Sequence, residues 1–324
     1  MQQRVVIFGG TGFIGLHVVR ACLAAGYAVT AVVRPRGDRE NRSAFQESFD
    51  GDLTVLSGDF TAKTDIRSAL TGATDVITLV GSTVPATAVN DPAHELFATV
   101  LPYVQFLDLA VECQVQRVVL ASSGGAIYGE PQRLPIPEGH PLNPITPYGI
   151  AKATIEGYCA FFEHQFGLDT RVLRLANPYG PGQRVEAGQG VIGTTFHRLL
   201  EGQPVTVYGD GRISRDFVFV EDVADAFVRA LTYGGSERTF NIGSGTATEL
   251  REVLALIEEV TGQPIKRRML PDRPFDVRAN ALDRSRARAC LGWQPTTPLR
   301  DGLCRTWEAL RAPNQTRAVV DADG

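Results

Sequence analysis

A tyrosine and a lysine four residues apart are the side chains best suited to do chemistry in this sequence. In "NPITPYGIAKATIE", Tyr148 and Lys152 stand at the start of a helical pattern, and the i, i+4 spacing puts them on one face. An ammonium beside a phenol stabilises the phenolate and lowers the phenol pKa from about 10 towards neutrality. Such a tyrosine can take a proton from a substrate hydroxyl. Because the spacing is common on helix surfaces, its meaning depends on the surrounding elements.

A glycine-rich segment, "VVIFGGTGFIGLHVV", supplies the first of these elements. Its glycines follow a strand pattern directly and open a helical pattern. In such a turn the backbone N–H groups can approach a pyrophosphate, and the helix dipole favours the anion there. The position in a βαβ context predicts a dinucleotide site. The expected contacts are Gly9, Thr11, Gly12, Phe13, Ile14 and Gly15.

The end of the second predicted strand bears on which dinucleotide is bound. An NAD site usually carries an acidic residue there, to hydrogen-bond the ribose. The segment "YAVTAVVRPRGD" ends instead on Val33, Arg34 and Arg36. An arginine can pair with a 2′-phosphate, which favours NADP, although a solvated basic loop is the alternative interpretation. Asp59, in "GDF", ends the third strand where an adenine edge would lie.

Short apolar runs alternate with helical stretches through the first half of the chain. Their continuous hydrophobicity is typical of strands buried on both faces of a parallel sheet. We therefore predict an α/β fold, a doubly wound (Rossmann) sheet with right-handed crossovers over residues 1–176. The expected strands are 4–9, 28–33, 53–59, 75–81, 117–123 and 170–176, and the expected helices are 13–25, 62–71, 92–113 and 148–166.

The sequence pattern changes after residue 176, where glycine- and proline-rich segments such as "NPYGPGQ" begin. We expect a smaller mixed α/β region over 177–312, packed over the C-terminal edge of the sheet, with some segments returning to the first domain. Residues 313–324 are polar and are expected to form a frayed tail. The expected helices of this region are 191–201, 221–232, 248–261 and 283–291.

Composition excludes several classes of protein. With 324 residues and a net charge of −4, the chain has no basic excess that would favour nucleic acid or an acidic membrane surface. No apolar run approaches the roughly 18–20 residues that span a bilayer. The five cysteines and five histidines are scattered, so we expect no metal site. The sequence passes from "MQQR" straight into a strand, which leaves no room for a signal peptide and favours the cytoplasm.

Taken together, these motifs resemble the extended short-chain dehydrogenases/reductases of the NAD-dependent epimerase/dehydratase family, and most closely the UDP-glucose 4-epimerase-like members. The resemblance runs from "GGTGFIG" to "RSRARACLGWQPTTPLRDGL". It implies that Tyr148 is the catalytic base and that Lys152 binds the nicotinamide ribose. It also implies that Asp59 and Phe60 flank the adenine and that Val80 contacts the cofactor.

The resemblance further implies a site for a nucleotide sugar, most simply a UDP-linked hexose. Two arginines would grip the diphosphate, since a guanidinium binds phosphate oxygens bidentately. These are Arg215 in "GDGRISRDFVFVEDVADA" and Arg273 in "LPDRPFDV", with Tyr208 beside the base and Asp276 towards the ribose. The other substrate contacts implied are Thr83, Ser123, Asn177 and Val191.

Several positions depart from the family pattern. Val33 stands where an acid is usual, Thr78 replaces a common histidine, and Thr99 replaces a common asparagine. In "VVLASSGGAIYGE", counting from the Tyr-Gly pair puts the usual catalytic hydroxyl on Gly124, whereas counting back from Tyr148 favours Ser123. We take Ser123 as the residue that orients the reacting oxygen. Ser122, Thr83 or a water molecule are the alternatives.

The function expected is a nucleotide-sugar 4-epimerase that oxidises C4 transiently with a tightly bound nicotinamide cofactor, NAD or NADP, and that forms a homodimer. An NADPH-dependent reductase of nucleotide-linked 4-keto sugars is the first alternative, favoured by Arg34 and Arg36. A 4,6-dehydratase is disfavoured because "SSGGAIYG" lacks an Asp-Glu pair. A catalytically silent sensor of cofactor or nucleotide sugar would not need an activated phenol.

Overall fold

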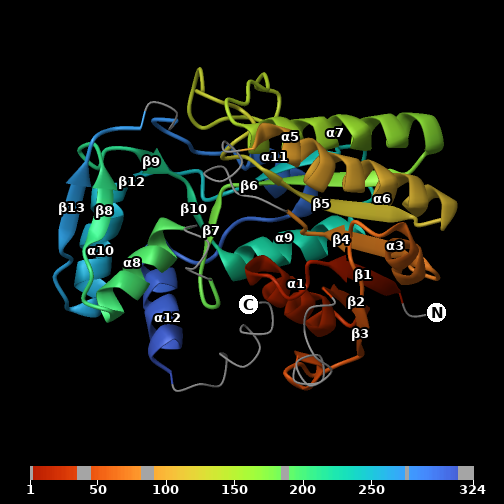
Figure 1. Cartoon of the computed structure of the whole chain (residues 1–324), viewed down its shortest axis with the longest axis horizontal. Coiled ribbons are helices and arrows are strands. Elements are labelled where there is room, and N and C mark those ends of the chain that lie inside the picture. Colours follow the sequence, from red (N-terminus) through yellow and green to blue (C-terminus); the bar gives the residue numbers. More distant parts are fainter. Residues whose placement is uncertain (1–2, 35–44, 82–90, 184–189, 274–276, 313–324) are drawn as a thin grey trace.

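The computed structural model describes residues 3–34, 45–81, 91–183, 190–273 and 277–312. Within these ranges, a seven-stranded parallel sheet runs in the order β11-β6-β5-β4-β1-β2-β3 (Figure 1). The chain order reverses between β1 and β4, and such sheets bind ligands beyond the carboxyl ends of the strands at that point. The strands are β1 (Arg4–Phe8), β2 (Ala28–Val33), β3 (Leu53–Ser57), β4 (Asp75–Thr78), β5 (Arg117–Ser123), β6 (Asp169–Leu175) and β11 (Thr239–Ile242).

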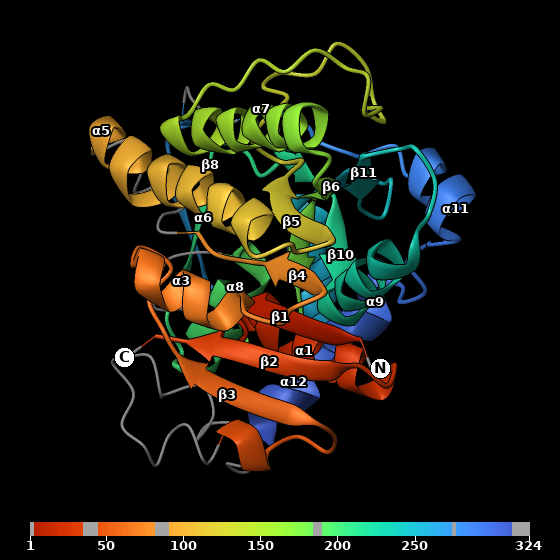
Figure 2. The same cartoon turned by 90° about the vertical axis from the view of Figure 1, so that its right-hand side faces the viewer.

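Helices cover both faces of this sheet (Figure 2). The central strands are buried almost throughout, as expected for a sheet that is covered on both sides. The predicted doubly wound α/β fold is confirmed. One face carries α1 (Phe13–Ala24) and α9 (Val220–Thr232), and the other carries α3 (Lys63–Leu70), α6 (Leu101–Glu112) and α7 (Pro147–Phe166).

All six predicted strands are present; β1 and β6 end one residue earlier than predicted, and β3 and β4 end two and three residues earlier. β3 stops at Ser57 and β4 at Thr78, so Asp59, Phe60 and Val80 lie in the loops that follow these strands. The expectations of strands over 53–59 and 75–81 were therefore too long; the backbone bonds from Gly58 N–H to Val33 O and from Leu79 N–H to Phe8 O carry each pairing one residue beyond the strand end. This places the three residues on the carboxyl edge of the sheet.

The predicted helix over 92–113 is three segments rather than one. These are α5 (Pro92–Glu95), the π-helix η1 (Leu96–Val100) and α6. Pro102 lies in the first turn of α6, and its missing N–H cannot bond to the carbonyl four residues earlier. The wider π turn accommodates that defect, and such turns occur often at functional sites.

The rest of the chain forms small two-stranded sheets and helices at one end of the large sheet (Figure 1). Their core includes Phe196 stacked on Trp307 at a centroid distance of 5.5 Å. Three elements beyond residue 176 return to the large sheet: β11 pairs with β6, and α9 and α11 (Ser285–Leu291) pack into the core on one of its faces. The remaining elements are β7 (Asn177–Tyr179), α8 (Val191–Leu200), β8 (Val205–Tyr208), β9 (Ser214–Arg215), β10 (Phe217–Phe219), β12 (Thr248–Glu249), α10 (Leu250–Thr261), β13 (Arg267–Leu270) and α12 (Leu299–Arg311).

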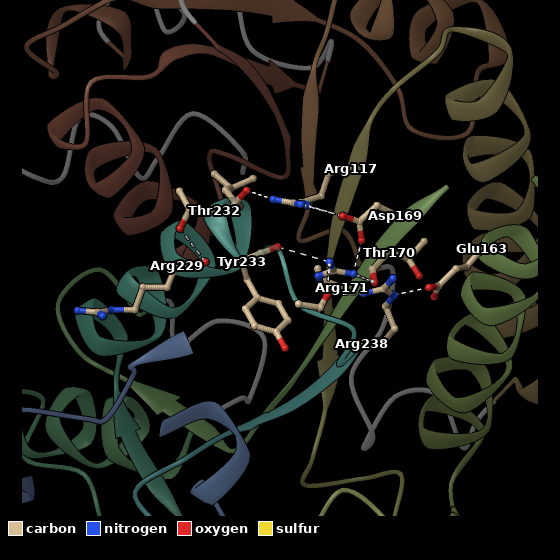
Figure 3. Close-up of polar contacts among 11 residues, drawn as sticks. Arg117, Glu163, Asp169, Thr170, Arg171, Arg229, Thr232, Tyr233 and Arg238 are labelled. Carbon is tan, nitrogen blue, oxygen red and sulfur yellow. Dashed lines mark hydrogen bonds and ion pairs between the residues drawn. The ribbon is translucent and has the colours of Figure 1, made fainter. Parts of the chain in front are cut away.

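A cluster of charged residues ties β5 and β6 to the segment between α9 and β11 (Figure 3). Arg117 at the start of β5 bonds Asp169 at the start of β6 through Nε at 2.9 Å. The buried Arg171 donates to the carbonyls of Tyr233 at 3.4 Å and Gly235 at 3.2 Å. The cluster therefore anchors the edge strand β11, and it lies at the amino ends of β5 and β6.

None of the helices in the described part of the chain combines the length and the apolar character needed to cross a membrane.

Candidate active site

The turn between β1 and α1 is built from glycines. Gly9 has a φ of 83°, and its carbonyl accepts a hydrogen bond from the Gly12 N–H at 3.1 Å. A Cβ atom on Gly15 would lie 2.0 Å from the Gly9 carbonyl oxygen, so no side chain fits there. Gly12 is the N-cap of α1 and brings no side chain to the N–H groups of the first turn, so this cradle fits a pyrophosphate. The other predicted contacts are half-buried in the same turn: Thr11, Phe13 and Ile14.

The end of β2 lies beside this turn. The Val33 carbonyl accepts a hydrogen bond from the Gly58 N–H at 2.8 Å, which brings the segment after β3 alongside β2. Val33 is buried, so the strand end offers no carboxylate to a ribose. The exposed Arg34 follows it, and Arg36 lies outside the described residues.

Asp59 and Phe60 lie just beyond β3 and face different ways. The Asp59 carboxylate accepts hydrogen bonds from the N–H and the hydroxyl of Thr61, both at 2.8 Å. The Phe60 ring packs into the core, with centroid distances of 5.2 Å to Phe8 and 4.9 Å to Tyr103. Of the predicted adenine-flanking pair, Asp59 is the half-buried member and Phe60 is buried by aromatic packing.

The first turn of α7 carries the predicted catalytic pair. The Thr146 hydroxyl caps the helix by accepting a hydrogen bond from the Gly149 N–H at 3.2 Å, and Pro147 opens it. The Tyr148 hydroxyl hydrogen-bonds the side chain of Ser123, the last residue of β5. The Lys152 Nζ lies 5.9 Å from the centre of the Tyr148 ring. The structure therefore brings all three predicted catalytic residues together.

The buried ammonium of Lys152 is directed at backbone carbonyls. It donates to Ala121 O at 3.1 Å and, at a longer 3.5 Å, to Val80 O. Burial lowers the pKa of Lys152 to about 8, and the nearby carboxylates of Glu95 and Glu156 oppose this shift. The Lys152 ammonium thus loses its proton at a pH not far above neutrality.

The pKa of Tyr148 does not follow the expectation that Lys152 lowers it. Burial raises the pKa of Tyr148 above its ordinary value, and the Glu95 carboxylate raises it further. The hydrogen bond from the Ser123 side chain acts in the opposite direction. The expectation was wrong for this arrangement, because the phenol is desolvated while the Lys152 ammonium is turned towards the carbonyls of Ala121 and Val80.

Three consecutive residues at the end of β5 have three different surroundings. The Ser122 hydroxyl bonds the buried carboxylate of Glu156, and Ser123 bonds Tyr148. A Cβ on Gly124 would lie 2.5 Å from a methyl carbon of Leu282. A side chain at 124 would therefore be driven against Leu282, whereas the Ser123 side chain bonds Tyr148.

Thr78 and Thr99, which replace a histidine and an asparagine common in the family, are both buried. The buried Thr78 hydroxyl bonds the hydroxyl of Tyr103 at 3.0 Å, and Tyr103 donates to Val80 O at 2.7 Å. Thr99 is buried in η1. Thr83, an alternative source of the hydroxyl, lies outside the described residues.

The sequence did not single out Tyr103 or Glu95. Both lie within the predicted helix 92–113, where an aromatic residue and a carboxylate look like ordinary core and surface positions. Tyr103 is part of the Lys152 environment, and Glu95 is buried and shifts the pKa of both Tyr148 and Lys152. Only the π turn, which packs this segment against α7, makes them neighbours of the site.

The predicted substrate residues lie on the elements at the end of the large sheet. Asn177 donates to Asp216 O through its N–H at 2.9 Å and its Nδ2 at 3.1 Å. Arg215 in β9 donates to the carbonyls of its neighbour Ser214 at 2.9 Å and of Val277 at 2.7 Å.

A stacked pair joins the last residue of β8 to the loop that follows β13. The Arg273 guanidinium lies 3.9 Å from the centre of the Tyr208 ring, which is close cation–π geometry. Val191 opens α8 and is half-buried, and Asp276 lies outside the described residues. The structure thus brings Tyr208 and Arg273 together, and these predicted substrate contacts remain predictions.

The fold and the site together define a class of protein. A doubly wound parallel sheet, a glycine turn after β1 and a Tyr-Lys pair with a serine at the end of β5 are the features of an extended short-chain dehydrogenase/reductase.

The chain belongs to the NAD dependent epimerase/dehydratase family, whose model matches residues 5–243. A UDP-glucose 4-epimerase of Mycolicibacterium smegmatis is 34% identical over 324 residues, which cover 97% of this chain and 100% of the relative. The structure of the Thermotoga maritima UDP-glucose 4-epimerase with UDP-glucose superposes with a TM-score of 0.85 at 33% identity, covering 95% of this chain and 99% of that one. The Thermus thermophilus UDP-glucose 4-epimerase in complex with NAD gives a TM-score of 0.85 at 32% identity, covering 96% and 100%.

Proposed function

We propose that the protein is a nucleotide-sugar 4-epimerase that interconverts UDP-hexoses through a tightly held NAD. One observation carries the proposal: Tyr148, Lys152 and Ser123 meet at the carboxyl edge of the sheet, close to the glycine turn, in a chain similar along its length to UDP-glucose 4-epimerases. The similar proteins from Thermotoga maritima and Thermus thermophilus bind UDP-glucose and NAD, respectively.

The chemistry divides among the residues of the site. NAD, when bound, would supply a hydride acceptor for C4, and the glycine turn and Lys152 would hold it beside Tyr148, whose pKa is raised by burial. Tyr148 takes the proton of the C4 hydroxyl and later gives it back. Ser123 shares a hydrogen bond with Tyr148, and its hydroxyl orients the C4 oxygen of the substrate. Lys152 binds the nicotinamide ribose, for which its ammonium must turn from Ala121 O.

The two arginines of the second region anchor the other end of the substrate. We propose that Arg215 and Arg273 hold the diphosphate while the oxidised sugar turns to present its opposite face. Tyr208, stacked on Arg273, would lie beside the base. Binding energy remote from C4 then positions the reacting carbon.

A second candidate function rests on the end of β2. Val33 leaves the ribose position without a carboxylate, and Arg34 follows it directly. An arginine there suits the 2′-phosphate of NADP, and a reductase of 4-keto nucleotide sugars must take up fresh NADPH in each turnover. The epimerase is the preferred proposal because relatives 34% and 31% identical along nearly the whole chain are UDP-glucose 4-epimerases, whereas a dTDP-4-dehydro-6-deoxyglucose reductase of Escherichia coli matches only 60% of it.

We further propose that the protein is a homodimer. Ile150, Tyr158 and Phe161 of α7 are exposed at helical spacing, and Phe97 and Leu101 are exposed beside them on η1 and α6. Monomers rarely expose so many large apolar side chains in one area. Light scattering after gel filtration should give twice the chain mass, and Phe161→Glu should reduce it to the monomer.

The cytoplasm is the compartment we propose. The five cysteines are all free, as is usual where glutathione keeps thiols reduced.

One experiment tests the proposed function directly. The purified protein is denatured, the released nicotinamide is identified, and the native protein is given UDP-glucose or UDP-galactose without added cofactor. Stoichiometric NAD and interconversion of the two sugars are expected. Tyr148→Phe should retain the cofactor and lose at least about 100-fold in rate, the scale of losing a general base. An empty protein that acts only with added NADPH would instead establish the reductase.

A further inference from the structure

We propose that Tyr103, held by Thr78, is a positioning residue that keeps the Lys152 ammonium available to the cofactor. It does so by occupying the carbonyl of Val80, which would otherwise attract the ammonium. The part of this inference that concerns the cofactor rests on the proposed function. The part that concerns the position of Lys152 stands on the structure alone.

A chain of hydroxyl groups reaches the Val80 carbonyl. Tyr103 donates to Val80 O at 2.7 Å, and the Thr78 hydroxyl lies 3.0 Å from the Tyr103 hydroxyl. Because the single Tyr103 proton goes to Val80, Thr78 must be the donor in the second bond. Both side chains are buried, so water cannot take over either bond. Burial also raises the pKa of Tyr103, which keeps its hydroxyl protonated and able to donate.

Lys152 approaches the same carbonyl from the other side. Its Nζ is 3.5 Å from Val80 O, at the limit of hydrogen bonding, but 3.1 Å from Ala121 O. The shorter bond from Tyr103 takes one lone pair of the Val80 carbonyl and leaves the ammonium the longer and weaker contact. The ammonium is therefore only weakly attached on the Val80 side.

The Tyr103 ring contributes a second constraint. It lies 5.6 Å from the Lys152 Nζ and packs edge-to-face on Phe60 at a centroid distance of 4.9 Å. Removing the hydroxyl and keeping the ring would preserve this packing. Tyr103→Phe therefore tests the hydrogen bond separately from the core.

Four ionisable groups besides Tyr103 face the ammonium. Glu95 from α5 and Glu156 from α7 favour its charged form, while Cys159 and Tyr148 also lie close by on α7. None of them bonds the Val80 carbonyl in the described part of the chain. When the Tyr103 hydroxyl is removed, Lys152 is a donor already within reach of that carbonyl, and its ammonium should move towards it.

This movement has two measurable consequences. A shorter bond from Lys152 to Val80 stabilises the charged form, so the pKa of Lys152 should rise. The ammonium also becomes less available to a ribose, so NADH should bind more weakly. A loss of core packing that admitted water would also raise this pKa, because burial is what lowers it, so the specific loss of NADH affinity is the readout that separates the two causes.

The composition of the chain makes the first readout simple. It contains only three lysines, Lys63, Lys152 and Lys266, so a protein labelled with 13Cε-lysine gives three signals to titrate by NMR. Loss of one signal in Lys152→Met assigns Lys152. The exposed Lys63 and Lys266 serve as internal references.

Wild type, Tyr103→Phe and Thr78→Val are compared, with Tyr179→Phe as the matched control. Tyr179 is equally buried and donates one hydrogen bond to a carbonyl, Leu299 O at 3.2 Å. In Tyr103→Phe the Lys152 pKa should rise by about one pH unit and the NADH dissociation constant by about 10-fold, the scale of one hydrogen bond to a charged group. Thr78→Val should act in the same direction but less strongly, and Tyr179→Phe should change neither quantity.

The outcomes separate this inference from the proposed function. If wild-type protein binds no nicotinamide, the proposed function fails, yet the Lys152 titration still decides the position of the ammonium. An unchanged or lowered Lys152 pKa in Tyr103→Phe would overturn the inference, whatever happens to activity. Should Tyr103→Phe not fold, Thr78→Val provides the same titration in a variant that retains the aromatic ring.

Discussion

Replacing Ser123 by alanine tests the assignment of the catalytic hydroxyl, which the sequence left between two positions. The Ser123 side chain hydrogen-bonds the Tyr148 hydroxyl, and this bond opposes the rise in the Tyr148 pKa that burial causes. When Tyr148 carries the negative charge, the bond is charge-assisted and contributes about 1.5–3 kcal/mol. Ser123→Ala should therefore lower kcat by about 10- to 100-fold.

The assay compares the interconversion of UDP-glucose and UDP-galactose with the amount of nicotinamide retained by the protein. Ser123→Ala should retain wild-type cofactor content, because the serine bonds the tyrosine rather than the glycine turn. Ser122→Ala is the matched control, since its hydroxyl bonds the buried Glu156 instead. Ser122→Ala should lower the free energy of unfolding, and its effect on kcat should be smaller than that of Ser123→Ala.

A third variant distinguishes Ser123 from the neighbouring position. A Cβ at 124 would lie 2.5 Å from a methyl carbon of Leu282 and 3.2 Å from Arg174 O, so Gly124→Ser cannot direct its hydroxyl at Tyr148 without a rearrangement. The double variant Ser123→Ala with Gly124→Ser should remain as slow as Ser123→Ala. Near-normal turnover of Ser123→Ala, or recovery in the double variant, would refute the assignment.

Three further predictions address the cofactor and the core. Since burial lowers the pKa of Lys152 to about 8, its ammonium is lost as pH rises through that value; NADH affinity should fall between pH 7 and 9, and Lys152→Met should abolish this dependence in fluorescence titrations. Arg34→Ala should weaken NADP by about 10-fold or more and leave NAD nearly unchanged if Arg34 binds a 2′-phosphate, and equal effects on both cofactors would contradict that role. Arg174→Met should lower the free energy of unfolding in urea by about 3–5 kcal/mol, because it leaves the buried Glu156 carboxylate without its ion pair, and a change below about 1 kcal/mol would contradict this.

Much of the fold is encoded in local patterns and could be predicted. The strands of the large sheet are continuous apolar runs, and the glycine turn is marked by its position after β1. The edge strand β11 gave no such signal, since four residues at an edge carry little hydrophobic pattern, and its anchoring depends on Arg117 and Arg171 far away in sequence. The helix α12 was missed although Leu299, Leu303, Trp307 and Leu310 recur at helical spacing, so its signal was present in the sequence.

Site residues could be predicted where they lie on one helix and their spacing along the sequence puts them on the same face. The Tyr148 and Lys152 pair is of this kind. The contact of Ser123 with Tyr148 joins β5 to α7, so the count along the chain could not decide between Ser123 and Gly124. The environment that sets the pKa values depends on burial and on Glu95, which the π turn brings to the site. For this reason the expected lowering of the Tyr148 pKa failed.

The central claim is that C4 loses its hydride to a bound cofactor and recovers it within one catalytic cycle. UDP-glucose carrying deuterium at C4 is mixed with UDP-glucose that carries 13C in the hexose and hydrogen at C4, and the mixture is incubated with the protein in the absence of added cofactor. The UDP-galactose formed should retain deuterium at C4, and product formed in D2O from unlabelled substrate should contain none there. Loss of the label to solvent, or turnover only when NADPH is added, would contradict the account.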